Sequence, residues 1–251
     1  MEKYFDINES GFSVRCKLYC SNVHDIRRAV IFGHGFGGHK DNKAAEKFAG
    51  KLISKHKDMC VVTFNWPCHG DDARKNLLLS ECDTYLTLVI EYVKRVFGAK
   101  EVYAYATSFG GFLFLKYIAE HGNPFKKIAL RCPAITLYDS MIHRIMSQDD
   151  LDKILKGKPA LVGFDRKIKI SKPFLDDLAA ADIRKYDYTD YADDILILHG
   201  NKDEIIPFDV SAEFADENVI EFIPVQNGDH RFTDPKIMDL TIHNIIEFFD
   251  S

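Results

Sequence analysis

The sequence predicts an α/β protein built on a mostly parallel β-sheet with helices on both faces. Short apolar runs alternate with longer segments of helical apolar spacing through most of the 251 residues, which is the pattern of successive βαβ units. Several short runs are apolar throughout, as expected of strands buried on both faces. Glycine-rich and polar clusters follow these runs, at the sheet edge where such folds bind ligands.

The chain opens with two strand-like runs, "EKYFDI" and "FSVRCKLYC", which the turn cluster "NESG" joins into a hairpin. Buried strands are expected next, each followed by a helix whose apolar residues recur at helical spacing. The expected strands are 28–35, 59–66 and 101–108, and the expected helices are 43–56, 81–97 and 109–122. Ser80 and Asp83 resemble a capping box for the second helix, and Gly98 ends it.

The second half adds three strands, 126–134, 194–200 and 219–225, and a closing helix, 234–249. The total is about eight strands. Between the first two of these strands, the chain is charged and irregular and too long for an ordinary connection. We therefore expect a cap at 134–193, inserted after the sixth strand into a core made of 1–133 and 194–251.

Composition excludes several classes of function. The formal net charge is −5, so no basic excess is available to neutralise nucleic acid phosphates. No run approaches 18 apolar residues, so no membrane span is expected. The N-terminus lacks the features of a signal peptide, and the six cysteines show no metal-ligand spacing. These features predict a cytoplasmic protein with reduced core cysteines and no metal.

Ser108 lies where the strand-like "YAYAT" meets the apolar helical run "FGGFLF". A sharp strand-to-helix turn tolerates only small residues two positions before and after its central residue, and Ala106 and Gly110 occupy those positions. This is the arrangement of a nucleophile elbow, with alanine at the first position. On the motif alone, a serine that merely caps the helix is an equal alternative.

Two further residues support a nucleophilic role. A serine hydroxyl needs a base, usually histidine, which a carboxylate orients. Asp203 follows the strand of "LILHGNKDE", and His230 follows the last strand in "NGDHRF". The order Ser, Asp, His is the one expected in this architecture. Glu204 and Asp209 are alternatives to Asp203 as the acid.

Two backbone N–H groups are predicted to bind the oxyanion. One is that of Phe109, directly after the nucleophile, and the other is that of Phe36 in the glycine-rich loop "GHGFGGHKDN". His34 in the same loop is a candidate base, but a role in shaping the loop is the better interpretation.

On the segments "GHGFGG", "NWPCHGDD", "ATSFGG", "HGNKDEIIP" and "GDHRF", the chain resembles the α/β-hydrolase superfamily over essentially its whole length. The loop "HGFGGHKDN", the length and the cap resemble bacterial cinnamoyl or feruloyl esterases and related small carboxylesterases. The resemblance implies Ser108 as nucleophile, His230 as base, Asp203 as acid, and no cofactor. In "NWPCHGDD", the residues Asn65, Cys68 and Asp72 depart from the usual pattern, which bears on pocket shape.

By the same resemblance, Asp139 lies where phenolic-acid esterases hold a substrate hydroxyl, although a role as the cap of the following helix is favoured. The expected function is a serine esterase acting on small acyl or hydroxycinnamoyl esters, with a small-molecule ester as the partner. A lipase or thioesterase acting on longer acyl chains is the alternative enzyme. A non-catalytic ligand-binding protein on the same fold is the other alternative, and a homodimer is compatible with the sequence.

Overall fold

The computed structural model describes all residues, 1–251. Its main sheet has eight strands in the order β1-β2-β4-β3-β5-β6-β9-β10. β1 and β2 form an antiparallel hairpin, β2 pairs antiparallel with β4, and every other neighbouring pair is parallel. The predicted eight-stranded, mostly parallel sheet is therefore confirmed. The strands are Glu2–Glu9 (β1), Phe12–Cys20 (β2), Arg28–Gly33 (β3), Met59–Phe64 (β4), Glu101–Thr107 (β5), Ile128–Arg131 (β6), Ile195–Gly200 (β9) and Glu221–Val225 (β10).

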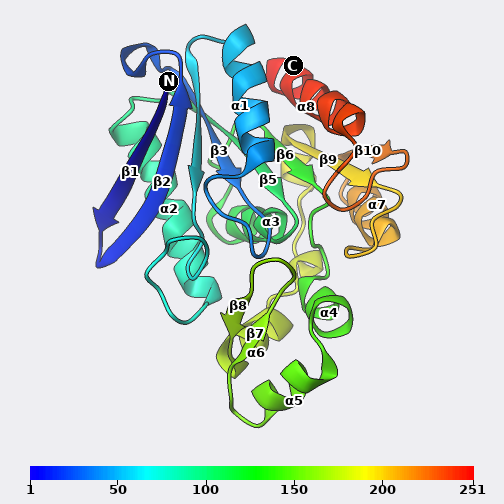
Figure 1. Ribbon diagram of the computed structural model, residues 1–251. Helices are drawn as coiled ribbons and strands as arrows, with labels where there is room; N and C mark the ends of the chain where they lie inside the picture. The colour runs from blue at the N-terminus through cyan, green and yellow to red at the C-terminus, as the bar shows by residue number, and fades with distance from the viewer.

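Helices cover both faces of this sheet (Figure 1). The successive side chains of β3 alternate between two apolar cores. Val30 and Phe32 pack with α1 and α8, whereas Ala29 and Ile31 pack with α2 and α3. The full set is Lys43–Lys55 (α1), Leu79–Arg95 (α2), Phe109–His121 (α3), Phe208–Glu217 (α7) and Pro235–Asp250 (α8), with a 3-10 turn at Val23–Asp25.

The start of α2 differs from the sequence prediction. The helix begins at Leu79, its N-cap is Leu78, and no side chain caps it. Ser80 lies inside the helix, where its carbonyl accepts a hydrogen bond from Thr84. The predicted capping box at Ser80 and Asp83 is therefore wrong. Leu79 is buried against the core, and the helix begins two residues earlier than expected despite the missing polar cap.

The segment between β6 and β9 combines short helices with a two-stranded hairpin, β7–β8. Figure 1 shows α5, α6, β7 and β8 gathered at one end of the molecule. The division into a core and a cap at 134–193 stays a prediction. The elements are Leu137–Ser140 (α4), a π-turn at Met141–Ile145, Gln148–Leu155 (α5), Ala160–Val162 (β7), Ile168–Ile170 (β8), Lys172–Ala180 (α6), and 3-10 turns at Ile183–Lys185 and Thr189–Asp194.

None of the helices combines the length and the apolar character that crossing a membrane requires. The six cysteines are free, and all except the half-buried Cys68 are buried.

Candidate active site

Ser108 occupies the sharp turn between β5 and α3. Its backbone has φ 52° and ψ −116°, a conformation that costs on the order of 1–3 kcal/mol for a residue other than glycine. The first turn of α3 lies tightly against the end of β3. A Cβ at Gly110 would lie 2.5 Å from the carbonyl oxygen of Gly33 and 2.8 Å from that of His34, so only glycine fits. The turn therefore projects Ser108 from a rigid, close-packed base.

His230 connects Ser108 to Asp203. The Nε2 atom of His230 lies 3.0 Å from Ser108 Oγ, and its Nδ1 atom lies 2.7 Å from Asp203 Oδ2. Because an ionised carboxylate only accepts hydrogen bonds, Nδ1 carries the proton and Nε2 is free to accept the serine proton. The structure thus brings together the three residues expected from the sequence, in the geometry of a general base beside a nucleophile.

The other acidic residues near this site have different partners. Asp209 is exposed in the first turn of α7. Glu204 is exposed, and its backbone carbonyl accepts a hydrogen bond from Arg144. The carboxylate of Asp229 accepts hydrogen bonds from the backbone and the hydroxyl of Thr233. Among these carboxylates, only that of Asp203 is bonded to His230.

Asp203 is held by four donors and its side chain is fully buried. Oδ1 accepts from the amides of Ile205 at 2.9 Å and Ile206 at 2.8 Å. Oδ2 accepts from His230 and also from Nε2 of His199 at 3.1 Å. Burial alone would raise the pKa of Asp203, but the hydrogen bonds from His199 and His230 outweigh it and hold that pKa well below its usual value. The carboxylate therefore stays charged at neutral pH.

The loop after β3 lies against the nucleophile. A Cβ at Gly35 would lie 3.2 Å from Cβ of Ser108. The backbone N–H of Phe36 forms no hydrogen bond in this loop. The N–H of Phe109 starts α3, where the first amides have no partner within the helix. Both predicted donors stand beside Ser108, and their role at an oxyanion stays a prediction.

Comparison with known proteins identifies the family. Residues 28–163 match the family described as the α/β hydrolase fold. The chain belongs to this family. No curated protein matches the sequence.

Several solved structures share the fold at low sequence identity. Est1E from Butyrivibrio proteoclasticus, determined with ferulic acid bound, is 16% identical with a TM-score of 0.75, and the alignment covers 98% of this chain and 100% of Est1E. Mouse α/β hydrolase domain-containing protein 10 is 15% identical with a TM-score of 0.74, covering 99% and 98% of the two chains. The esterase domain of a Rhodothermus marinus protein is 15% identical with a TM-score of 0.70, covering 99% and 97%.

In this α/β hydrolase, a close contact between two glycines joins the loops that carry Asp203 and His230. A Cβ at Gly200 would lie 2.1 Å from the carbonyl oxygen of Gly228. That carbonyl accepts a hydrogen bond from the amide of Lys202 at 2.9 Å. Asn201 adds a second connection, because its side chain accepts from the amide of Asn227 at 2.8 Å. The distance between Asp203 and His230 therefore depends on this contact.

We expect Gly200→Ala to separate these loops. The added methyl group should cost about 1–3 kcal/mol of unfolding free energy and lower kcat/KM for an ester. Gly50→Ala is the matched control, because nothing lies within 4 Å of a Cβ there and alanine should stabilise α1 by about 0.5–1 kcal/mol. Urea denaturation with parallel kinetics measures both effects. A Gly200→Ala protein as stable and active as the wild type would contradict the argument.

Two buried histidines shape the glycine-rich loop after β3. His34 Nδ1 donates to the carbonyl of Gly35 at 2.8 Å, and its Nε2 accepts from the amide of Trp66 at 3.3 Å. The prediction that His34 shapes the loop is therefore confirmed. His69 Nδ1 donates to the carbonyl of Pro67 at 2.9 Å, and its ring stacks on Phe109 at 5.9 Å. Burial lowers the pKa of His34 well below its usual value and that of His69 to about 4.

These shifts make the folded protein sensitive to acid. With a pKa near 6.5 when unfolded and about 4 when folded, His69 takes up a proton first in the unfolded chain. The contribution of His69 to the free energy of unfolding is therefore largest above pH 6.5 and is lost as the pH drops toward 4. The loss from this group is about 2 kcal/mol between pH 7 and pH 5. In chemical denaturation at both pH values, His69→Phe should lose less stability than the wild type, and an equal loss would exclude His69 as the source.

The structure does not bring Asp139 to the triad. It lies in the first turn of α4, its side chain is exposed, and it makes no hydrogen bond. The favoured expectation that Asp139 caps this short helix is wrong, because the N-cap residue is Thr136 and no side chain caps the helix. The proposed contact of Asp139 with a substrate hydroxyl stays a prediction.

Sequence reasoning missed two residues beside Asp203. His199 is the first residue of the quoted motif "HGNKDEIIP", and only the fold turns its ring toward Asp203. Cys132, at the end of β6, has φ 45°, and its Sγ lies within 4.8 Å of ligand atoms of Asp203 and His230. Burial and the charge of Asp203 raise the pKa of this thiol, so it is a neutral neighbour. Two sets of side chains are close enough together to hold a metal ion: Cys132, Asp203 and His230, and at the surface the half-buried Asp83 with the exposed Glu120 and His121.

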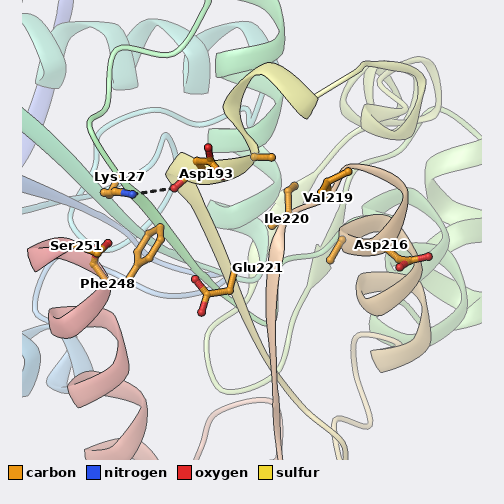
Figure 2. Close-up of a pocket in the computed structure, with 10 residues that line it drawn as sticks. Lys127, Asp193, Asp216, Val219, Ile220, Glu221, Phe248 and Ser251 are labelled. Carbon is orange, nitrogen blue, oxygen red and sulfur yellow. Dashed lines mark hydrogen bonds between the residues drawn. The ribbon is translucent and has the colours of Figure 1, made fainter.

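A separate open hollow of about 630 Å³ lies near the amino ends of the parallel strands. Figure 2 shows Lys127, just before β6, directed toward Asp193, just before β9, with Phe248 beside it. Lys127 Nζ donates to the carbonyl of Asp193 at 2.8 Å. Because the hollow adjoins the amino ends of the strands, it is remote from Ser108.

Proposed function

We propose that this α/β hydrolase cleaves carboxylic esters through an acyl-enzyme. The observation that carries the proposal is the unbroken hydrogen-bonded series from Asp203 through His230 to Ser108, with distances of 2.7 Å and 3.0 Å. A protein that only binds ligands has no need of such a series, so the geometry favours catalysis over binding.

In the first half-reaction, Ser108 Oγ attacks the carbonyl carbon of the ester while its proton passes to Nε2 of His230. The amides of Phe36 and Phe109 donate to the oxyanion that forms, and each such donor typically contributes about 10²–10³ in rate. Asp203 stabilises the imidazolium. The intermediate then collapses, the carbon–oxygen bond to the alcohol breaks, and the alcohol leaves with the proton from His230.

In the second half-reaction, His230 takes a proton from water, and the resulting hydroxide attacks the acyl-enzyme. The bond to Ser108 breaks, Oγ recovers the proton, and the carboxylic acid leaves. The reaction consumes one water and needs no cofactor.

Small acyl or hydroxycinnamoyl esters are the proposed substrates. The rings of Phe36 and Phe109 meet edge to face at 5.8 Å beside the nucleophile, and Phe174 of α6 lies 6.5 Å from Phe109. Phe109 and Phe174 are fully buried, so the half-buried ring of Phe36 is the one in this group that a flat acyl group can contact. The solved structure of Est1E with ferulic acid has the same fold, which supports this choice.

A panel of 4-nitrophenyl esters of increasing chain length, assayed beside methyl ferulate, tests the proposal. We expect measurable kcat/KM on acetate, butyrate or methyl ferulate, with a decline toward decanoate and longer chains. A maximum at long chains would favour the lipase or thioesterase alternative. Absence of turnover on every ester would contradict the proposed function.

A further inference from the structure

The cap carries a strongly basic stretch on an acidic protein. Residues 153–172 include seven Lys or Arg and one Asp, a formal charge of +6, whereas the whole chain carries −5. Five of these cations are exposed and have no carboxylate oxygen within 4.0 Å. We call them the basic hairpin patch: Lys156, Lys158, Arg166, Lys167 and Lys169. The remaining cations of the stretch, Lys153 and Lys172, pair with Asp150 and Asp176.

The hairpin presents this charge outward. Leu161 and Lys169 are cross-strand partners of β7 and β8, and both are exposed while the residues on either side of each are buried. They therefore lie on the same, solvent-facing side of the hairpin. Arg166 and Lys167 belong to the turn between the two strands.

The turn of the hairpin lies beside the catalytic loops. A Cβ at Gly37 would lie 2.9 Å from the carbonyl oxygen of Arg166, and a Cβ at Gly163 would lie 3.5 Å from the ring of Phe36. On the other side, Asp165 forms an ion pair at 2.8 Å with Arg231, which follows His230. The turn thus spans from the glycine-rich loop after β3 to the loop that carries His230.

The positive charge of Arg166 in the turn affects a residue of the glycine-rich loop after β3. Burial, and next the charge of Arg166, lowers the pKa of His39 in that loop. The one acidic residue of the turn, Asp165, is paired with Arg231 and does not offset the patch. Several unpaired charges of one sign at the mouth of a site raise the local concentration of counter-charged substrates and their association rates by about 10–10³.

We propose that the basic hairpin patch selects anionic esters, which carry a carboxylate or a phosphate outside the scissile bond. This inference rests on the proposed function and adds the substrate class to it. The patch acts before the chemical step, by attracting the anionic substrate toward Ser108. Its effect therefore appears in kcat/KM and decreases as the salt concentration rises.

The test compares two esters of nearly equal shape, 4-acetoxybenzoate and 4-acetoxybenzamide, which differ in charge. The ratio of their kcat/KM values cancels changes common to both. In the triple variant Arg166→Glu, Lys167→Glu and Lys169→Glu, we expect the benzoate-to-benzamide ratio to fall by about tenfold or more at about 0.1 M salt. In 0.5 M NaCl the wild-type ratio should fall toward that of the variant.

The matched control reverses the same number of charges away from the mouth. Lys57, Lys94 and Lys100 are exposed and have no carboxylate oxygen within 4.0 Å, and Lys57 and Lys100 precede β4 and β5 at the opposite edge of the sheet. At about 0.1 M salt, where screening is strong beyond about 10 Å, their triple Glu variant should keep the wild-type ratio within about twofold. An unchanged ratio in the patch variant, or equal falls in both variants, would overturn the inference. Turnover of neither ester by the wild type would overturn the proposed function with it.

A second, independent observation concerns His199. Its side chain is fully buried, and its Nε2 lies 3.1 Å from Asp203 Oδ2 and 3.3 Å from the carbonyl of Ile206. Both oxygens only accept, so Nε2 carries the proton. Its other nitrogen, Nδ1, is buried without any partner. An unpaired buried nitrogen is unfavourable, so His199 is a poor choice for stability alone.

From this geometry we infer that His199 is a positioning residue for the reaction. His199 donates to Asp203 Oδ2, the same oxygen that accepts from His230. This hydrogen bond fixes the rotation of the Asp203 carboxylate and stabilises part of its negative charge. Besides the two imidazoles, the thiol of Cys132 faces this carboxylate and is uncharged. This inference also rests on the proposed function.

Two variants separate positioning from structure. Glutamine carries an amide N–H the same number of bonds from Cα as Nε2 of histidine, whereas leucine has similar bulk and no donor. We expect His199→Leu to lower kcat about 10- to 100-fold, by analogy with the loss found when outer-shell partners of metal ligands are removed. The acid limb of its kcat/KM profile should move to higher pH, because the undivided charge of Asp203 then favours protonated His230.

His199→Gln should recover most of the activity and the wild-type pH profile. Thermal melting of both variants supplies the structural readout: we expect His199→Leu to melt lower than the wild type, because the buried Asp203 carboxylate loses a donor, and activities are therefore compared well below the melting temperature of each variant. Activity of His199→Leu within twofold of the wild type would overturn the inference. So would a glutamine variant as impaired as the leucine variant.

Discussion

Replacing Ser108 by alanine is expected to lower kcat for ester hydrolysis on the order of 10⁶-fold, the loss seen when a triad serine is removed elsewhere. No other hydroxyl is bonded to His230, so no residue can take over the attack. The measurement is kcat with a 4-nitrophenyl ester of short chain, on protein whose fold is checked by thermal melting. Residual activity above about 1% would place the nucleophile elsewhere.

Ser108→Gly provides an internal control for the strained turn. Glycine adopts φ near 52° without steric cost, so this variant should be as inactive as Ser108→Ala but more stable by about 1 kcal/mol. Equal stability of the two variants would contradict the strain assigned to the elbow.

The second large effect is expected at Asp203. Asp203→Asn should reduce kcat about 10⁴-fold, as the same exchange does in another serine hydrolase by leaving the histidine in the wrong tautomer. Here the loss has an additional cause, because both His199 and His230 donate to Oδ2 and an amide nitrogen cannot accept from either.

Asp209→Asn is the matched control. Asp209 also lies near the start of α7, but it is exposed and is not bonded to His230. It should therefore keep wild-type kcat. If Asp203→Asn remains close to the wild type while Asp209→Asn or Glu204→Gln is impaired, the acid has been assigned to the wrong residue.

Much of the fold could be predicted because its strands are unusually clear. β3, β4 and β5 are buried on both faces and read as continuous apolar runs, and each ends in glycine or polar residues. The strand ends in turn locate Ser108, Asp203 and His230, because parallel strands bring their carboxyl ends to one edge. The site could therefore be anticipated from residues about 120 positions apart.

Other features depend on tertiary contacts that no local pattern encodes. The start of α2 follows from burial of Leu79 and not from a polar cap. The strands β7 and β8 have only three residues each, too few to show a period. The ring of His199 meets Asp203 only because the chain turns sharply between them. The basic hairpin patch lies beside the loops of Phe36 and His230 through the close approach of Gly37 to Arg166, the contact of Gly163 with Phe36 and the ion pair of Asp165 with Arg231.

Covalent labelling with a fluorophosphonate tests the central claim most directly, because the reagent requires an activated serine and no knowledge of the substrate. Intact mass and peptide mapping should find a single adduct on Ser108 in the wild type. The adduct should be absent in Ser108→Ala and form far more slowly in His230→Ala. No adduct on the wild type, or undiminished labelling of Ser108→Ala, would contradict the assignment of Ser108 as an activated nucleophile.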